Sequence, residues 1–276
     1  MKKNRPIIGA IAIAVLLVAS ACATSNDSPA ADPGPDALIA PGVLSVCISK
    51  NGYPPLYFKE DGELKGFDVE STQAIADELG VKLSWLEVAF DGLIPSLTTG
   101  RCDLMRSGLY ISEERLKVAD GIPYLATGPG LVVTKGNPHG ITSADDLSGL
   151  RVAAQAASAN AKILQELSDK LVAEGKQPIS IEQYPELPET VAAVQNGKAD
   201  ALIETDIAAA AVATSQAGSL EFVTGVFKQS TDFGMYLAKD NPLLTDIKKA
   251  AKVLSDDGTF AAIAEKYGID PDNLAS

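Results

Sequence analysis

The sequence predicts an α/β protein of two lobes, because short apolar runs alternate with amphipathic helical segments and this alternation starts again midway along the chain. A chain of 276 residues is long enough for two domains of ordinary size. Its 46% apolar and 21% charged residues are typical of a globular protein. We therefore expect each lobe to be a mostly parallel sheet flanked by helices.

The first half reads strand, helix, strand, helix, strand. Apolar runs predict strands at 44–49, 81–88 and 103–107. Helices are expected to begin at Asp68 and Asp91, because apolar residues then recur every three or four positions until a glycine. This order is the βαβ pattern of a parallel sheet.

The second half repeats the pattern without detectable repetition of the sequence itself. Strands are predicted at 151–155, 179–184 and 199–204, and helices at 158–174 and 189–196.

The chain ends with a strand at 234–239 and helices at 242–256 and 259–267. Polar, glycine-rich segments at 134–140 and 225–232 are expected to connect the lobes.

The N-terminus is typical of an export signal. Three basic residues precede an apolar run at 7–18, and small residues up to Ala21 predict cleavage, so we expect 1–21 to be a signal peptide. Cys22 follows directly, which resembles the lipobox of bacterial lipoproteins, and the Ser-, Asp-, Ala- and Pro-rich residues 22–41 predict a disordered tether. Ordinary cleavage would instead leave Cys22 as a free thiol.

Export to an oxidising compartment would permit a disulfide between the other two cysteines. Cys47 falls late in one predicted strand, and Cys102 falls just before another. If these strands are parallel neighbours, the thiols lie near opposite ends, beyond the ~7 Å Cα limit for a bridge. We therefore expect two buried thiols.

Composition excludes several functions. A net charge of −13 argues against a nucleic-acid partner. The single histidine, His139, excludes metal sites that need two, and no nucleotide-binding or nucleophile-elbow motif is present. We expect no metal and no cofactor.

Four segments in order carry a family resemblance. They are NGYPPLYFKEDGELKGFDVE (51–70), FDGLIPSLTTGRCDL (90–104), SGLYISEERLKVADGIPYL (107–125) and SADDLSGLRVAAQAASAN (143–160). Together they resemble bacterial extracellular solute-binding proteins of the polar amino acid type, which supply ABC importers, and the resemblance spans about 42–270.

The resemblance implies a Venus-flytrap fold, with lobe 1 formed by 42–133 plus 228–276 and lobe 2 by 134–227. It implies a lipoprotein, not an enzyme, that is anchored through Cys22 on the outer face of the cytoplasmic membrane. Because such a receptor must close freely, we expect a monomer. Its partners would be an amino acid or related small carboxylate and an ABC permease.

An amino acid zwitterion needs a cation for its carboxylate and an acceptor for its ammonium. Arg115 stands at the family's carboxylate-binding position, although its sequence context also fits a solvated helix start. Gly108 and Tyr110 stand at neighbouring binding positions, where Tyr110 replaces the usual Thr or Ser.

The second lobe would supply the remaining polar groups. Ser158 falls at a helix N-terminus that favours a carboxylate, and it is equally a plain N-cap. The family's ammonium acceptor aligns by strict counting with Thr205, between Glu204 and Asp206. We favour Asp206, although strand alternation places it on the same side as Glu204.

The ligand's side chain would pack between Tyr53 and Phe90, residues that elsewhere are often plain core. Lys50 replaces the Asp of relatives that bind cationic amino acids, and it would repel such ligands unless it points into solvent.

Two other functions compete with transport. Cyclohexadienyl dehydratases share this fold and need a carboxyl acid in the cleft, a role open to Asp206 or Glu204. A ligand-sensing module is the third possibility, although such modules are usually fused to a membrane span.

Overall fold

The computed structural model describes residues 37–275. The expected signal peptide and Cys22 lie outside the described residues. Within 37–275, no helix is both long and apolar enough to cross a membrane.

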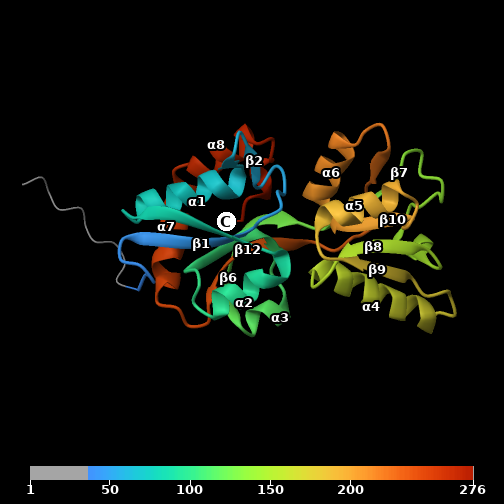
Figure 1. Cartoon of the computed structure of the whole chain (residues 1–276), viewed down its shortest axis with the longest axis horizontal. Helices are drawn as coiled ribbons and strands as arrows, with labels where there is room; N and C mark the ends of the chain where they lie inside the picture. Colours follow the sequence, from blue (N-terminus) through green and yellow to red (C-terminus); the bar gives the residue numbers. More distant parts are fainter. Residues whose placement is uncertain (1–36, 276) are drawn as a thin grey trace, which may run out of the picture. The chain divides into compact units, whose positions relative to one another are not determined.

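The first sheet has five strands in the order β4-β1-β5-β12-β6. Figure 1 labels its strands β1, β12 and β6. Strand β1 pairs in parallel with β4 and β5, whereas β12 pairs antiparallel with β5 and β6. In chain order these strands are β1 (Val43–Ser49), β4 (Lys82–Val88), β5 (Leu104–Tyr110), β6 (Ala119–Thr127) and β12 (Thr231–Ala238). The sheet is therefore mixed. The sequence pattern predicted its three parallel strands and most of the antiparallel β12, but not β6.

Side-chain alternation along β1 divides the core of this sheet. Val46 and Ile48 pack with one set of helices, while Cys47 packs on the opposite face with Leu93 and Leu97. The first face is covered by α1 (Phe67–Glu78), α7 (Leu243–Asp256) and α8 (Thr259–Lys266), and the second by α2 (Leu93–Thr98). We call this sheet with its helices and the short α3 (Glu113–Leu116) the first lobe.

The second sheet has the order β11-β7-β10-β8-β9. Strand β8 pairs in parallel with β9 and β10, and β7 pairs antiparallel with β10 and β11. These strands are β7 (Pro129–Thr134), β8 (Arg151–Gln155), β9 (Ser180–Tyr184), β10 (Ala201–Thr205) and β11 (Leu220–Val223).

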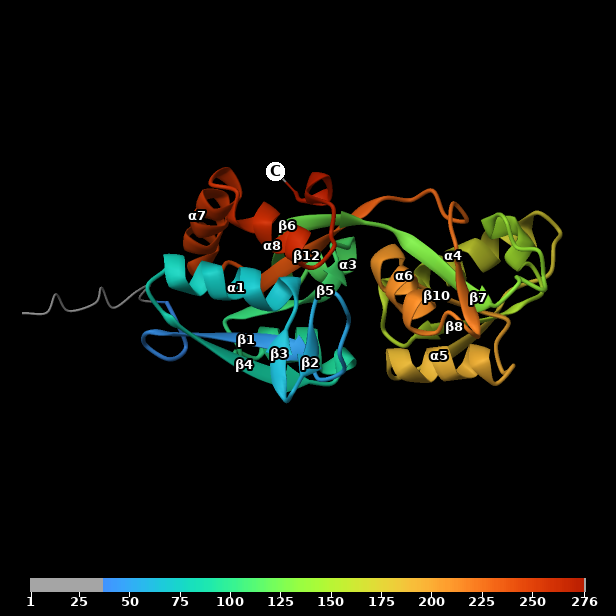
Figure 2. The same ribbon diagram turned by 90° about the horizontal axis from the view of Figure 1, so that it is seen from above.

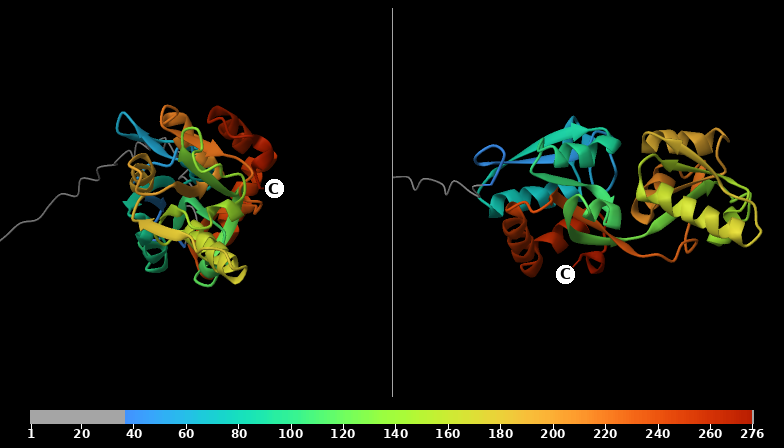
Figure 3. Two further views of the ribbon diagram at one scale, coloured as in Figure 1. Left: turned by 90° about the vertical axis from the view of Figure 1, so that its right-hand side faces the viewer. Right: turned by 90° about the horizontal axis from the view of Figure 1, so that it is seen from below.

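Helix α4 (Ala159–Ala173) covers one face of the second sheet, and α5 (Leu187–Gln195) and α6 (Asp206–Ser215) cover the other (Figure 3). We call this sheet with its helices the second lobe. Shorter elements are the β2–β3 hairpin (Phe58–Glu60 and Glu63–Lys65) and three 3₁₀ turns (Phe90–Gly92, Ala144–Leu147 and Pro271–Asn273).

The first crossing between the sheets comes earlier than we expected. Strand β6 leads through Gly128 straight into β7, which belongs to the second sheet (Figure 2). The crossing therefore lies at Gly128 and not at 134–140, where we expected it. A single glycine interrupts the apolar run and is enough to separate the strands of the two sheets. The chain returns between Val223 and Thr231.

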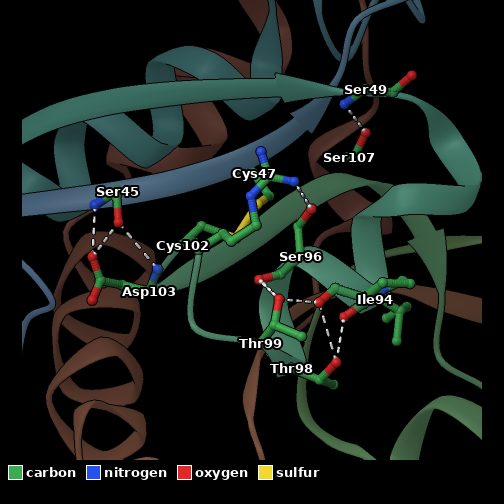
Figure 4. Close-up of a disulfide and its surroundings, with 12 residues drawn as sticks. Ser45, Cys47, Ser49, Ile94, Ser96, Thr98, Thr99, Cys102, Asp103 and Ser107 are labelled. Carbon is green, nitrogen blue, oxygen red and sulfur yellow. Dashed lines mark hydrogen bonds between the residues drawn. A yellow bond between two sulfur atoms is a disulfide. The ribbon is translucent and has the colours of Figure 1, made fainter.

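The expectation of two free thiols at Cys47 and Cys102 is wrong, because these residues form a disulfide with Cα atoms 5.7 Å apart (Figure 4). Strands β1 and β5 are parallel neighbours as assumed. However, β5 begins only at Leu104, and the Asp103 N–H donates to the Ser45 carbonyl at 2.8 Å. Cys102 therefore precedes the extended strand, and the bend at Asp103 brings it beside Cys47.

Candidate functional site

The candidate site is a cavity of about 30 Å³ at the carboxyl ends of the parallel strands of both sheets. Ligands of open α/β sheets bind at such ends. The first lobe contributes residues that end or follow β1, β4 and β5, and the second lobe those that end or follow β8, β9 and β10. The lining residues are Ser49, Asn51, Gly52, Tyr53, Tyr57, Phe90, Ser107, Gly108, Leu109, Tyr110, Arg115, Gln155, Ser158, Ala159, Asn160, Glu186, Leu187, Glu204 and Thr205.

Most residues singled out from the sequence line this cavity, and two do not. The lining includes Tyr53, Phe90, Gly108, Tyr110, Arg115, Ser158, Glu204 and Thr205. Asp206 lies outside the lining, where its carboxylate accepts hydrogen bonds from Thr127 Oγ1 at 2.6 Å and the Ile207 N–H at 2.7 Å. Lys50 is also outside, with 55% of its side chain exposed.

Arg115 is the cation of the cavity. Ser112 caps the turn that carries it, and the guanidinium donates from Nη1 to the Tyr110 carbonyl at 2.7 Å. Burial lowers the pKa of Arg115, while Tyr236 and Glu114 act in the opposite direction. An arginine stays charged under such a shift, so its remaining N–H groups are available to an anion.

Glu204 is the more deeply buried of the two acidic groups in the lining, Glu186 being the other, and is only 5% exposed. Its Oε1 accepts hydrogen bonds from the Tyr53 hydroxyl at 2.7 Å, the Thr205 N–H at 2.9 Å and Asn160 Nδ2 at 3.4 Å. Burial raises the pKa of this carboxyl, and the bonds from Tyr53 and Thr205 offset part of the rise. Across residues 37–275, no lysine, arginine or histidine nitrogen lies within 4.0 Å of it.

Two buried polar atoms of the lining have unused hydrogen-bonding capacity. The Tyr110 hydroxyl and Asn160 Oδ1 have no partner in the described part of the chain. Buried polar groups are normally paired with protein, water or ligand. These atoms therefore mark the cavity as a place for a polar molecule.

Gly108 and Tyr53 form the cavity wall of the first lobe. The Tyr53 ring stacks on Tyr57 with centroids 6.0 Å apart. Gly108 has φ 58°, and a Cβ there would lie 2.9 Å from Leu56 Cδ1 and 3.2 Å from the Tyr53 ring. The close approach of this wall therefore requires glycine.

At the second lobe, Ser158 is the N-cap of α4 and accepts a hydrogen bond from the Ala161 N–H at 3.0 Å. Glu186, which precedes α5, accepts a hydrogen bond from Gln155 Nε2 at 3.3 Å and lies 3.8 Å from Lys50 Nζ. The sequence reasoning did not select Gln155, Asn160 or Glu186. Their positions at the ends of predicted strands or the start of a predicted helix were the available signal.

A second cavity of about 270 Å³ adjoins the first one. The two share Phe90, Leu109, Arg115, Ser158 and Ala159. The small cavity is therefore a recess beside a larger space.

A recess of this kind, with one cation, one unpaired acid and a largely preformed wall, defines a protein that binds a small polar solute. The chain belongs to the bacterial extracellular solute-binding proteins, family 3, whose family model matches residues 44–270.

Two curated relatives and one solved structure illustrate the similarity. The probable amino-acid-binding protein YxeM of Bacillus subtilis is 33% identical, covering 97% of this chain and 95% of its own length. The L-cystine-binding protein TcyJ of Escherichia coli is 32% identical and covers 82% of each chain. The structure of an ancestral arginine-binding protein bound to arginine matches with a TM-score of 0.74 and 31% identity, covering 82% of this chain and 98% of that one. The family and the two-lobed α/β fold that we expected are confirmed.

Proposed function

We propose that this protein captures an amino acid outside the cytoplasm and delivers it to an ABC importer. The observation that carries the proposal is one cavity that contains a cation, Arg115, and a buried acid without a cationic partner, Glu204. These are the two groups that an amino acid zwitterion requires. The names of the relatives support the same class of ligand.

Arg115 and the N-terminus of α4 would bind the carboxylate. A guanidinium can form two parallel hydrogen bonds to a carboxylate. The first N–H groups of α4, next to Ser158, have no partner within their own helix and add a favourable dipole. This role is compatible with N-capping by Ser158.

Glu204, together with Asn160 Oδ1, would accept the ammonium. The ammonium would give Glu204 its missing cation and Asn160 Oδ1 its missing donor. Asp206 is a weaker candidate because its carboxylate already accepts hydrogen bonds from Thr127 and Ile207. Thr205 is occupied as the N-cap of α6. The ligand's side chain would pack between Tyr53 and Phe90.

Capture would follow from contacts that only the closed protein offers. The Tyr53 hydroxyl of the first lobe bonds Glu204 and lies 2.7 Å from Thr205 Oγ1 of the second lobe. A zwitterion held by Arg115 and Glu204 would bridge the same two lobes. Ligand would therefore shift the population towards the closed state, which the permease would recognise.

The test is calorimetric titration of the purified protein with the twenty amino acids, repeated on Arg115→Met. We expect at least one amino acid to bind, and Arg115→Met to weaken it by about 30-fold or more, the loss typical of truncating a buried charge partner. Arg101→Met, which removes an exposed arginine outside the cavity, is the matched control. Unchanged affinity in Arg115→Met, or consumption of prephenate by the protein, would contradict the proposal.

We also propose that the protein is a monomeric lipoprotein anchored through Cys22 after removal of residues 1–21. Its acidic, tether-like sequence before the fold supports this arrangement. Mass spectrometry of the processed N-terminus checks it: a diacylated Cys22 is expected in the natural chain, and none in Cys22→Ser.

A further inference from the structure

A second pair of opposite charges lies at the edge of the cavity, away from Arg115 and Glu204, with Glu186 in the lining and Lys50 outside it. Lys50 follows β1 in the first lobe, and Glu186 follows β9 in the second. Strand β9 is separated from β10, which ends beside Glu204, by β8 alone. Two strand spacings therefore place Glu186 about 10 Å from Glu204 along the edge of the sheet.

Both members of this pair retain bonding capacity. Lys50 Nζ and Glu186 Oε1 are 3.8 Å apart, too far for a good hydrogen bond. The Glu186 side chain lines the cavity and is 15% exposed, and Gln155 Nε2 holds its other oxygen at 3.3 Å. Lys50 is 55% exposed and reaches across from the opposite lobe. The Glu186 side chain also accepts from the Glu189 N–H in the capping box of α5. Each charge is thus positioned, while the contact between the two charges is loose.

The charges of this pair discriminate among ligand side chains. A cationic end would pair with Glu186 but meet Lys50, and an acidic end would pair with Lys50 but meet Glu186. A neutral amide would engage neither charge fully. An end that carries both an ammonium and a carboxylate would give Glu186 and Lys50 one opposite charge each.

We infer that Lys50 and Glu186 form a second zwitterion subsite, and that the preferred ligand is an elongated bis-amino acid with a zwitterion at each end. The inference rests on the proposed function, because Arg115 and Glu204 would hold the first zwitterion. The apolar middle of such a ligand would lie between Tyr53 and Phe90.

The first test compares ligands that differ only at the far end. Titrations use L-cystine and its thioether analogue L-cystathionine as two-headed probes. S-methyl-L-cysteine, glutamine, glutamate and arginine carry a single zwitterion. We expect the two-headed probes to bind about tenfold more tightly or better, the gain from one or two charge-assisted hydrogen bonds. Equal or tighter binding of any one-headed probe would overturn the inference.

The second test neutralises the subsite with Lys50→Gln and Glu186→Gln. Each should reduce the affinity for the two-headed probes about tenfold while changing that for S-methyl-L-cysteine less than about twofold. Lys59→Gln and Glu87→Gln remove another ion pair, at 2.8 Å and outside the cavity, and serve as matched controls. Unchanged affinity for two-headed probes in both subsite variants would refute the second subsite.

The outcomes separate this inference from the proposed function. Tight binding of a one-headed amino acid that depends on Arg115 and ignores Lys50 and Glu186 would leave the proposed function intact and refute the inference. Absence of binding by every probe would refute the inference, and absence of binding by all twenty amino acids as well would refute the proposed function.

Discussion

Replacing Glu204 by glutamine should weaken ligand binding and stabilise the empty protein at the same time. Glutamine has nearly the same shape as glutamate and keeps an acceptor for the Tyr53 hydroxyl and the Thr205 N–H, so the wall of the cavity should remain in place. What disappears is the negative charge. The variant therefore isolates the electrostatic role of one buried carboxylate.

The expected loss of affinity follows from the contacts of Glu204. The carboxylate is 5% exposed and has no cationic partner among residues 37–275, so a bound ammonium would be its full counter-charge. Removing one member of such a buried, hydrogen-bonded charge pair costs about 2–5 kcal/mol, which corresponds to a loss of about 30-fold or more. Calorimetric titration of wild type and Glu204→Gln measures it.

The expected gain in stability depends on pH with a defined sign. Burial raises the pKa of Glu204 in the folded protein, so the folded chain holds this proton more tightly than the unfolded chain. The free energy of unfolding therefore falls as pH rises from the unfolded-state pKa through the folded-state pKa, and the loss persists above both. Glutamine does not titrate and avoids this loss.

Thermal denaturation of both proteins without ligand, from about pH 4 to about pH 8, tests the sign, since an unperturbed glutamate titrates near pH 4.3. The difference in Tm should favour Glu204→Gln and widen with pH. A difference that stays constant with pH, or an affinity within threefold of wild type, would refute the assigned role of Glu204.

Two further substitutions test the frame of the site. The double variant Cys47→Ala, Cys102→Ala opens a disulfide loop of 55 residues, which corresponds to about 4 kcal/mol of lost stability by loop-closure entropy. We therefore expect Tm to fall by about 8–16 °C. An unchanged Tm would contradict the disulfide. Gly108→Ala should lower both Tm and ligand affinity, because the new Cβ would lie 2.9 Å from Leu56 Cδ1. Gly197→Ala shares the positive φ without any neighbour within 4 Å, and it should leave affinity unchanged.

The sequence pattern predicted the parallel halves of both sheets, because strands such as β1 and β8 are buried apolar runs next to clearly amphipathic helices. It missed α6 (Asp206–Ser215), whose run of alanines offers no contrast between polar and apolar faces. It also missed β6 and β7, since Pro123, Gly128 and Gly130 punctuate their apolar residues. Strands β6 and β7 become recognisable only through their pairing with other strands of the sheets.

The sequence favoured Asp206 over Glu204, and in the structure the strand ends between these two acids. Alternation along a strand places residues 204 and 206 on one side, but β10 stops at Thr205 and α6 begins at Asp206. The side-chain direction therefore changes between the two acids. The N-cap at Thr205 is a local feature that the sequence could have indicated. The contact of Asp206 with Thr127 depends on the tertiary fold and could not be read from the sequence.

The division of the site between two sheets carries a consequence for affinity. Tyr53 and Glu204 meet in the cavity although 151 positions separate them in the chain. Arg115, which we propose binds the carboxylate, belongs to the first lobe, and Glu204, which we propose binds the ammonium, belongs to the second. Either lobe alone could satisfy only one charge of a zwitterion and would leave the other in water. Under the proposed function, pairing of both charges therefore requires both lobes, so the contacts that recognise the ligand would also hold the protein closed.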